Sequence, residues 1–384
     1  MRGRPVTRHM KYIKQLDSLR GIAVLLVIIT HWFPEGHPLH DYTSFFNGVD
    51  IFFVLSGFLI TRILLENRNE AEATATGKWF VAKNFYIRRF LRIFPIYYGL
   101  ILVMFALGPK TSTHIRENVG NFLTYTSNIY FIQKGKWEGV LSHLWSLSVE
   151  EQFYLLWPWI MLFLRKRFLL PVIVVSIVTG VVGQYYFSPI ATFSCFDGFG
   201  LGALLAWAVV YKPESLQKAY VPSLWLAGSS CLLQAARVFS DSRFEPLPSR
   251  TLTAFCTAAV VLGVLLGKGQ GSLFSKAILK NRALQFVGKI SYGVYLYHLM
   301  VAYCFSKIFS AINLRLFPTA TVFNEYLVNV ENFCLLLAGA YLSWRFIEQP
   351  ILQLKRKYAY QKPTTPATGK MYRTQPATPA EKLE

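Results

Sequence analysis

Apolar windows of about 20 residues recur along the chain, and this feature constrains the fold more than any other. A helix needs about 20 mostly apolar residues to cross a hydrocarbon core of about 30 Å. Such windows lie at 20–34, 46–65, 90–108, 145–164, 168–187, 192–211, 221–239, 251–267, 288–308 and 327–347. The sequence therefore predicts an all-α protein, a polytopic membrane helix bundle of about ten transmembrane helices.

Composition and charge narrow the class of protein further. Charged residues make up 16% of the 384 residues and hydrophobic residues 53%, whereas about 25% of residues are charged in soluble domains. This excludes a soluble enzyme with a single core. The net charge of +20 could suggest a nucleic-acid partner, but the Lys and Arg residues lie between the apolar windows rather than on one exposed face. We therefore expect a multi-pass protein of the cell (inner or plasma) membrane. It would lie in a lipid bilayer and would not bind nucleic acid.

The distribution of basic residues predicts the orientation. If the N-terminus is cytoplasmic, 31 of the 40 Lys and Arg residues fall on the cytoplasmic side, as the positive-inside rule requires. Both termini are then cytoplasmic. We expect a basic N-terminal segment over 1–15, a transmembrane domain over 16–350 and a cytoplasmic tail over 351–384. From about Tyr358 onward the tail is rich in Pro, Thr, Lys and Ala, so most of it should be disordered, because this composition cannot bury enough apolar surface.

Ionisable residues inside membrane spans are costly and are therefore candidates for function. Arg20 and His31 have ten residues between them, so a helix would place them about 16 Å apart, with His31 in the outer half of the bilayer. Asp50 lies at a similar depth in the second window and needs a cation, a histidine or a hydroxyl as its partner. The nearby Gly57 is expected to allow close helix packing.

Three arginines enter the third window from the cytoplasmic side. Arg88, Arg89 and Arg92 are spaced so that a helix points them roughly the same way. Guanidinium groups match phosphate oxygens in geometry. The cluster therefore suggests a phosphate-binding face, and simple anchoring of the helix end is the alternative.

The most informative stretch, 143–154, enters the fourth window. His143, Ser146 and Glu150 follow the spacing i, i+3, i+7 and share one helical face. Ser148 and Glu151 lie in the same stretch. A passive span does not need two adjacent carboxylates and a histidine, so this stretch favours a functional site.

The later windows hold further ionisable residues. His298 lies about midway through the ninth window, with Tyr295 at helical spacing from it. Arg345 can pair with Glu348 at the end of the last window, an arrangement that we interpret as structural. Asp197 has no motif around it and is expected to be a satisfied packing site.

Together these segments resemble the acyltransferase-3 family of integral membrane acyltransferases. The resemblance covers 16–350 and rests on six segments in the family's order: 20–31, 48–60, 85–95, 143–150, 290–298 and 345–350. It implies transfer of an acyl group, most often acetyl from cytoplasmic acetyl-CoA, to a hydroxyl of a cell-surface glycan, of peptidoglycan or of a small molecule such as a macrolide. Many relatives carry an extracytoplasmic domain after the membrane domain. Without it, acceptor binding would belong to the membrane domain or to a separate extracytoplasmic acyl-handling protein.

The resemblance also implies roles for the candidate residues. Arg20 and His31 correspond to an essential arginine-to-histidine motif, and the three arginines of the third window to a cytoplasmic cluster suited to acyl-CoA. We expect His31 to be the base that deprotonates the acceptor hydroxyl, or a transient acyl carrier.

The remaining candidates would assist His31. Asp50 or Glu150 would orient its ring, and His143 or a nearby serine would help the reaction. Contacts with the substrate are expected from Ser146, Ser148 and His298. No metal and no permanently bound cofactor are expected, since acyl transfer from a thioester needs a base and hydrogen-bond donors.

Two other classes of protein remain as alternatives. A proton-coupled transporter or lipid flippase could use buried acids and histidines as a proton relay. However, transporters often have repeated halves, which this sequence does not show, and a transport function gives the arginine cluster no obvious role. A structural protein of an envelope complex would tolerate neutralisation of that cluster.

Overall fold

The computed structural model describes residues 12–43, 46–74, 76–111, 113–239, 249–269, 271–317 and 321–360. Within these ranges the chain is helical and has no β-strand, which confirms the predicted all-α class. Most of the predicted N-terminal segment (1–11) and most of the predicted tail (361–384) lie outside the described residues.

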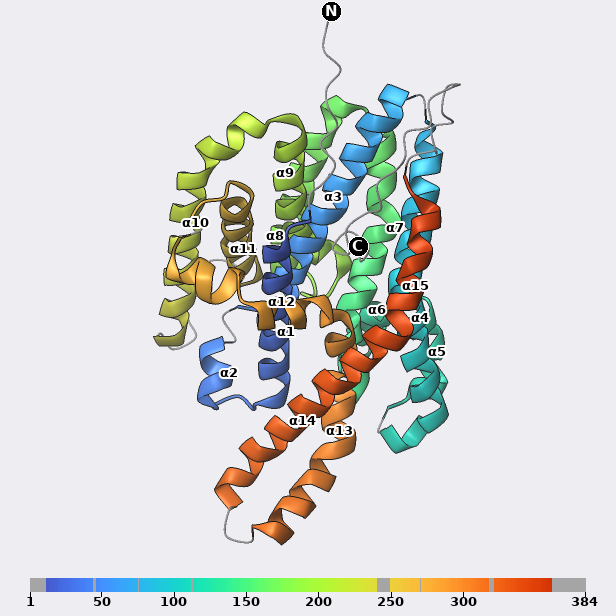
Figure 1. Cartoon of the computed structure of the whole chain (residues 1–384), viewed down its shortest axis with the longest axis vertical. Coiled ribbons are helices and arrows are strands. Elements are labelled where there is room, and N and C mark those ends of the chain that lie inside the picture. The colour runs from blue at the N-terminus through green and yellow to red at the C-terminus, as the bar shows by residue number, and fades with distance from the viewer. Residues whose placement is uncertain are drawn as a thin grey trace, which may run out of the picture.

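Each predicted apolar window overlaps a helix (Figure 1). The long helices are α1 (Lys14–Trp32), α3 (Gly48–Thr74), α4 (Lys78–Leu107), α7 (Leu144–Phe163), α8 (Leu169–Tyr186), α9 (Phe196–Tyr211), α10 (Pro213–Phe239), α11 (Ser249–Leu265), α13 (Ser291–Leu316) and α14 (Thr321–Ser343). Shorter helices lie between them, namely α2 (Pro38–Thr43), α5 (Ile115–Leu123), α6 (Ser127–Lys134) and α12 (Arg282–Lys289), and α15 (Gln349–Gln353) follows α14. The α13–α14 hairpin extends below the rest of the bundle in Figure 1.

Six helical segments in the described part of the chain are long and apolar enough to cross a membrane. They are Gly48–Thr74, Lys78–Leu107, Lys166–Tyr186, Thr192–Tyr211, Ser291–Leu316 and Asn324–Tyr358. The chain is therefore a multi-pass membrane protein. The count of ten spans and the cytoplasmic position of both termini stay predictions.

Helix α3 packs against α1, α4, α7, α9 and α11. Its contact with α9 depends on small residues, because a Cβ atom on Gly57 would lie only 2.1 Å from the carbonyl oxygen of Phe199. A Cβ atom on Gly202 of α9 would lie equally close, at 2.1 Å, to the carbonyl oxygen of Val54. Such close backbone approach is what small residues permit between membrane helices, and it confirms the packing role predicted for Gly57.

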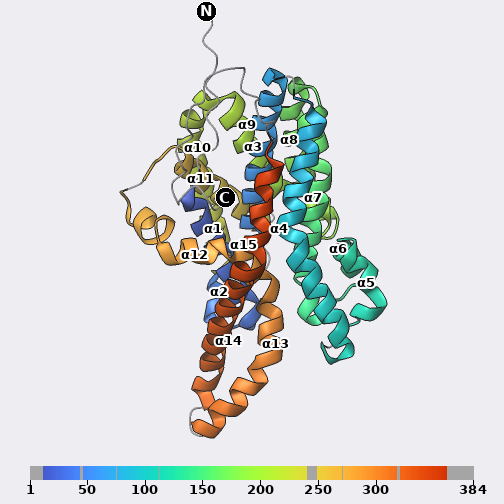
Figure 2. The same ribbon diagram turned by 45° about the vertical axis from the view of Figure 1, so that its right-hand side comes forward.

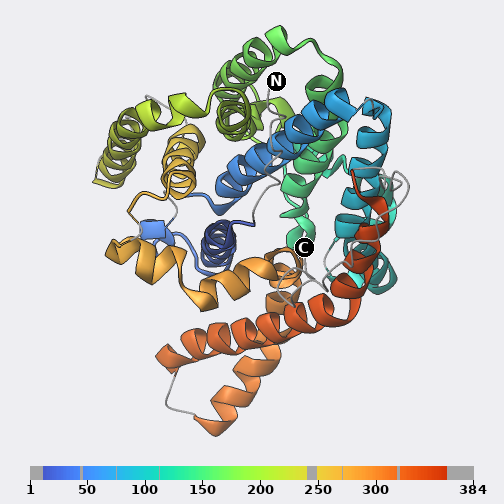
Figure 3. The same ribbon diagram turned by 45° about the horizontal axis from the view of Figure 1, so that its top comes forward.

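Helix α1 lies between α3 and the α12–α13 segment and is seen nearly end-on, in dark blue, in Figure 3. A Cβ atom on Gly21 would lie 2.4 Å from the carbonyl oxygen of Leu284, and one on Gly288 would lie 1.8 Å from that of Asp17. This tight packing against α12 fixes the position of α1, which carries Arg20 near its start and His31 near its end.

Helices α5 and α6 lie beside the lower end of α4 in Figure 2. A buried carboxylate, Glu138, connects them, because it accepts hydrogen bonds from the His114 backbone N–H (2.9 Å) and from the Tyr130 hydroxyl (2.6 Å). The His114 imidazole also lies 3.3 Å from this carboxylate. Burial raises the pKa of Glu138, but these hydrogen bonds outweigh burial and hold the pKa below its ordinary value.

Replacing Glu138 by alanine should lower the free energy of unfolding by about 1–3 kcal/mol at neutral pH, because two buried donors lose their acceptor. The carboxylate stabilises the fold fully above the pKa of the unfolded chain, about 4.3, and loses this effect as the pH falls through the lower folded-state pKa. The difference between Glu138→Ala and the unchanged protein should therefore shrink in acid. Thermal unfolding at neutral and acidic pH would measure it. The exposed Glu117 of α5 supplies the control Glu117→Ala, and equal stability of the two variants at neutral pH would contradict the prediction.

Candidate active site

A cavity of about 310 Å³ lies between the start of α1, α4, the start of α13 and the segment that follows α14. We call it the arginine cavity, because seven Lys and Arg side chains line it against two carboxylates. The cations are Arg20, Arg88, Arg89, Arg92, Lys289, Lys355 and Arg356, and the carboxylates are Asp17 and Glu348. A concave surface with this excess of positive charge attracts polyanions.

A second cavity of about 90 Å³ adjoins the first, and we call it the inner cavity. The residues that line both are Arg20, Leu59, Arg89, Arg92, Ser291 and Tyr292. The inner cavity adds hydroxyl and carboxyl groups from three helices, namely Ser56, Ser146, Glu150, Tyr154 and Tyr295. The two cavities therefore form adjoining compartments, one cationic and one rich in hydroxyl groups.

Hydrogen bonds organise the polar side chains of the inner cavity. The Tyr154 hydroxyl donates to Ser56 Oγ (2.9 Å), and Ser56 Oγ donates to Glu150 Oε1 (3.0 Å). The hydroxyl groups of Ser146 and Tyr295 lie 2.5 Å apart. Ser146 and Glu150 thus line the same cavity from one face of α7, as their spacing predicted.

Three imidazole rings form a row beyond the Ser146–Tyr295 pair. The ring centroids of His143 and His298 lie 4.8 Å apart, and those of His298 and His31 lie 5.0 Å apart. We call these residues the histidine row. Tyr295 connects the row to the inner cavity, since its hydroxyl donates to the carbonyl oxygen of His143 (2.8 Å). His143 and His298 are buried, whereas His31 is exposed.

The hydrogen bonds of the row fix which ring nitrogen carries the proton in the neutral imidazoles. His31 Nδ1 lies 2.7 Å from the carbonyl oxygen of Val27, and His298 Nδ1 lies 2.6 Å from that of Tyr295. A carbonyl oxygen only accepts hydrogen bonds, so each Nδ1 is the protonated nitrogen. Nε2 of each ring then keeps its lone pair and can accept a proton. His298 Nε2 is buried and has no hydrogen-bond partner in the described part of the chain.

Asp50 has a cation as its partner, one of the three kinds predicted, but neither candidate carboxylate orients His31. Asp50 was expected to orient His31, but its carboxylate pairs with Arg250 Nε (2.8 Å). Glu150, the alternative, accepts from Ser56. The prediction that a carboxylate orients the ring is therefore wrong, because the carbonyl group of Val27 on the preceding turn of α1 does so.

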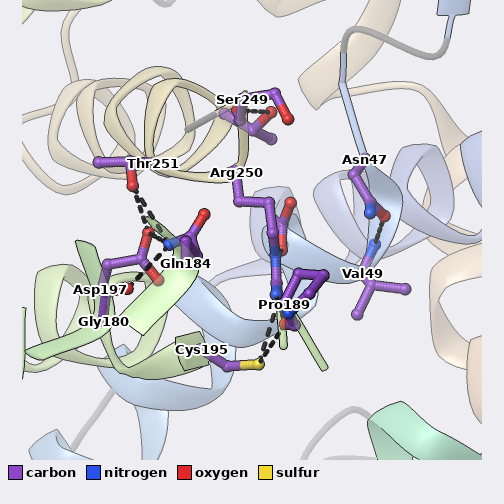
Figure 4. A network of polar contacts seen from close by, with 12 residues as sticks. Asn47, Val49, Gly180, Gln184, Pro189, Cys195, Asp197, Ser249, Arg250 and Thr251 are labelled. Carbon is purple, nitrogen blue, oxygen red and sulfur yellow. Dashed lines mark hydrogen bonds and ion pairs between the residues drawn. The ribbon is translucent and has the colours of Figure 1, made fainter. Parts of the chain in front are cut away.

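Arg250 lies at the centre of a polar network, which Figure 4 shows with Arg250 directed toward Cys195 and Pro189. Its Nη2 lies 3.2 Å from Cys195 Sγ, and its Nη1 donates to the carbonyl oxygen of Pro189. Asp197 belongs to the same region and accepts hydrogen bonds from Gln184 (2.9 Å) and Thr251 (2.6 Å). Asp197 is thus a satisfied packing site, as predicted.

The three arginines of α4 all line the arginine cavity, which confirms that they share a face. Arg92 lines both cavities, and the Arg89 guanidinium lies 4.7 Å from the centre of the Tyr154 ring. Arg88 differs from its neighbours, because its Nη1 donates to carbonyl oxygens of Lys355 (3.1 Å) and Tyr358 (3.4 Å).

Other predicted residues lie outside the cavities or have different partners. Ser148 is fully buried, bonds to the Ser127 hydroxyl (2.8 Å) and lines neither cavity, so it packs α7 against α6. Arg345 was expected to pair with Glu348, but it donates to Gln349 (2.8 Å). The helix widens into a π-helix over Trp344–Glu348, and this change of register turns Glu348 into the arginine cavity.

Several residues of the site were not predicted from the sequence. Arg250 is a lone arginine 200 positions from Asp50, and only its place directly before the eighth window pointed to a role. The cations Lys355 and Arg356 fall in the predicted tail, 351–384, ahead of the segment from about Tyr358 onward whose composition predicted disorder. Residues 351–358 are helical in α15 and in the turn Leu354–Tyr358.

Residues 13–345 match a family described as an acyltransferase domain. Peptidoglycan O-acetyltransferase OatA of Listeria monocytogenes is 29% identical over 380 residues, and the putative peptidoglycan O-acetyltransferase YrhL of Bacillus subtilis is 31% identical over 385 residues. These alignments cover 89% and 90% of this chain and 56% of each relative, so the chain spans little more than half their length. No solved structure matches.

The family match covers most of the chain and every residue of the histidine row, the inner cavity and the α4 arginine cluster. The chain therefore belongs to the acyltransferase-3 family.

Proposed function

We propose that this protein is a membrane O-acyltransferase that moves an acyl group, acetyl in the simplest case, from cytoplasmic acyl-CoA to a hydroxyl of a cell-wall glycan. The observation that carries the proposal is the arrangement of three groups of residues in space: those of a cationic cavity, those of an adjoining hydroxyl-rich cavity, and a row of three histidines. The names of the two peptidoglycan O-acetyltransferase relatives support a glycan acceptor.

The arginine cavity supports binding of the donor. Coenzyme A carries its phosphates at the nucleotide end and its thioester at the end of a flexible arm. The phosphates would pair with the guanidinium groups, above all Arg89 and Arg92, and the arm would extend into the inner cavity. There the Ser146 hydroxyl would donate a hydrogen bond to the thioester oxygen as it becomes negatively charged, while the Tyr295 hydroxyl donates to the carbonyl oxygen of His143.

The histidine row supports activation of the acceptor. The acceptor hydroxyl gives its proton to Nε2 of His31 while its oxygen attacks the thioester carbon. The carbon–sulfur bond then breaks, the acyl group stays on the acceptor oxygen, and the thiolate of CoA leaves and takes up a proton. To meet His31, the acyl end of the donor must pass the Ser146–Tyr295 pair, which separates the inner cavity from the row.

The test of this function is a transfer assay with the protein in lipid nanodiscs. Acetyl-CoA labelled in the acetyl group is supplied with peptidoglycan fragments, and both release of CoA and label on the glycan are measured. We expect both to appear together and in equal amounts. A proton-coupled transporter would release no CoA, and absence of both products would contradict the proposal.

Replacing Arg92 by glutamine should weaken acetyl-CoA binding by about 10-fold to about 100-fold, because one charge-assisted contact with phosphate is lost. Thermal stabilisation by acetyl-CoA would measure the affinity. Lys83 lies on the same helix, is exposed and lines neither cavity, so Lys83→Gln is the matched control. Equal affinity of the two variants would count against the arginine cavity as the donor site.

A further inference from the structure

The chain folds back onto α4 after the last long helix. Residues 349–360, which we call the C-terminal strap, continue through α15 and the helical turn Leu354–Tyr358. Asn84 Nδ2 donates to the carbonyl oxygen of Ala359 (2.7 Å), and Arg88 donates to two further strap carbonyls. Asn84 is buried. These hydrogen bonds hold the strap at a defined position on α4.

The strap forms one wall of the arginine cavity. Its first residue, Gln349, lines the cavity. Five later strap residues also line it, namely Leu352, Gln353, Lys355, Arg356 and Tyr360. The Tyr360 ring lies beneath the Arg88 guanidinium, with 5.1 Å between its centre and the guanidinium carbon. The strap thus contributes two cations and one aromatic ring opposite the arginines of α4.

The distribution of strap residues between the two cavities indicates which part of a donor they would meet. None of them lines the inner cavity. In the proposed function the thioester end of the donor occupies the inner cavity, so the strap faces the opposite end of the molecule. For an acyl-CoA that end is a phosphorylated adenosine nucleotide, which offers a flat base and several phosphate oxygens.

We propose that the C-terminal strap is the nucleotide subsite of the donor, with Lys355 and Arg356 binding phosphate oxygens and Tyr360 stacking against the adenine base. This inference rests on the proposed function. An ammonium and a guanidinium are suited to phosphate, and stacking on an aromatic ring binds a base without further hydrogen bonds. Arg88 then acts as a positioning residue, since it holds the strap through its carbonyl groups.

The experiment compares two donors that differ only in the nucleotide. Acetyl-CoA and acetyl-pantetheine, which lacks the nucleotide, are each supplied to the full chain in nanodiscs. Lys355→Gln and Tyr360→Leu should each raise KM for acetyl-CoA by about tenfold, the effect of one charge-assisted or stacking contact. KM for acetyl-pantetheine and kcat with either donor should stay unchanged. Lys357 is exposed on the same turn and does not line the cavity, so Lys357→Gln is the matched control.

Two results would overturn the subsite. One is an equal loss of activity with both donors, which would show that the strap only supports the fold. The other is an unchanged KM for acetyl-CoA in both variants. Failure of the proposed function itself looks different, because the unchanged protein would then bind no acetyl-CoA and would use neither donor.

Discussion

Replacing His31 by glutamine is expected to lower the rate of acyl transfer by about 100-fold to about 10,000-fold, the usual contribution of a general base. Glutamine can keep a hydrogen bond to the carbonyl oxygen of Val27 through its amide, but it has no basic nitrogen to replace Nε2. The acceptor hydroxyl would therefore keep its proton. The transfer assay with labelled acetyl-CoA would measure the loss, and donor affinity should stay unchanged because His31 lines neither cavity.

The control for this variant is another histidine at the same end of the bundle. His40 of α2 pairs with its neighbour Asp41 and has no ring contact with the histidine row. His40→Gln should therefore transfer acetyl at the normal rate. Normal transfer by His31→Gln, at normal amounts of folded protein, would show that His31 is not the base.

Chemical rescue separates a chemical role of His31 from a structural one. His31 lies at the end of α1 and is exposed at the surface of the helix bundle, and we expect added imidazole to reach the space that His31→Ala leaves. Added imidazole should restore part of the rate in His31→Ala and none in His31→Gln, where the side chain fills the space. A merely structural histidine would show no dependence on imidazole.

The helices of this fold follow directly from the sequence, because hydrocarbon requires long apolar segments. Each predicted window overlaps a helix. Local spacing was equally informative within one helix: Ser146 and Glu150 line one cavity, and the three arginines of α4 line another. Both results depend only on the fixed geometry of an α-helix.

Partners that lie on different helices could not be predicted in the same way. Asp50 required a partner by its burial alone, yet the candidates included any cation, histidine or hydroxyl of the other spans. The strap was missed for a different reason. Its position on α4 depends on hydrogen bonds from Asn84 and Arg88 to backbone carbonyl groups, which leave no pattern in the strap's own sequence.

The second large effect concerns stability. Replacing Arg250 by glutamine is expected to lower the free energy of unfolding by about 3–5 kcal/mol, because the buried Asp50 carboxylate then loses its partner. Asp50 is 2% exposed; Arg250 Nε donates to its Oδ1, and its Oδ2 has no hydrogen-bond partner in the described residues. The Arg250 guanidinium also lies 5.6 Å from the ring centres of both Phe53 and Trp145, and these cation–π contacts would be lost as well. Titration with sodium dodecyl sulfate would measure the change.

The double variant Asp50→Asn with Arg250→Gln distinguishes a structural ion pair from a catalytic carboxylate. Removing both charges leaves neither member of the pair as an unpaired buried charge, so much of the lost stability should return. The ion pair lies among α3, α11 and the turn before α9 and lines neither cavity. We therefore expect the double variant to regain acyl transfer together with stability. A double variant that is stable but inactive would instead assign the Asp50 carboxylate to the chemistry, because stability and activity would then depend on different properties of the same residue.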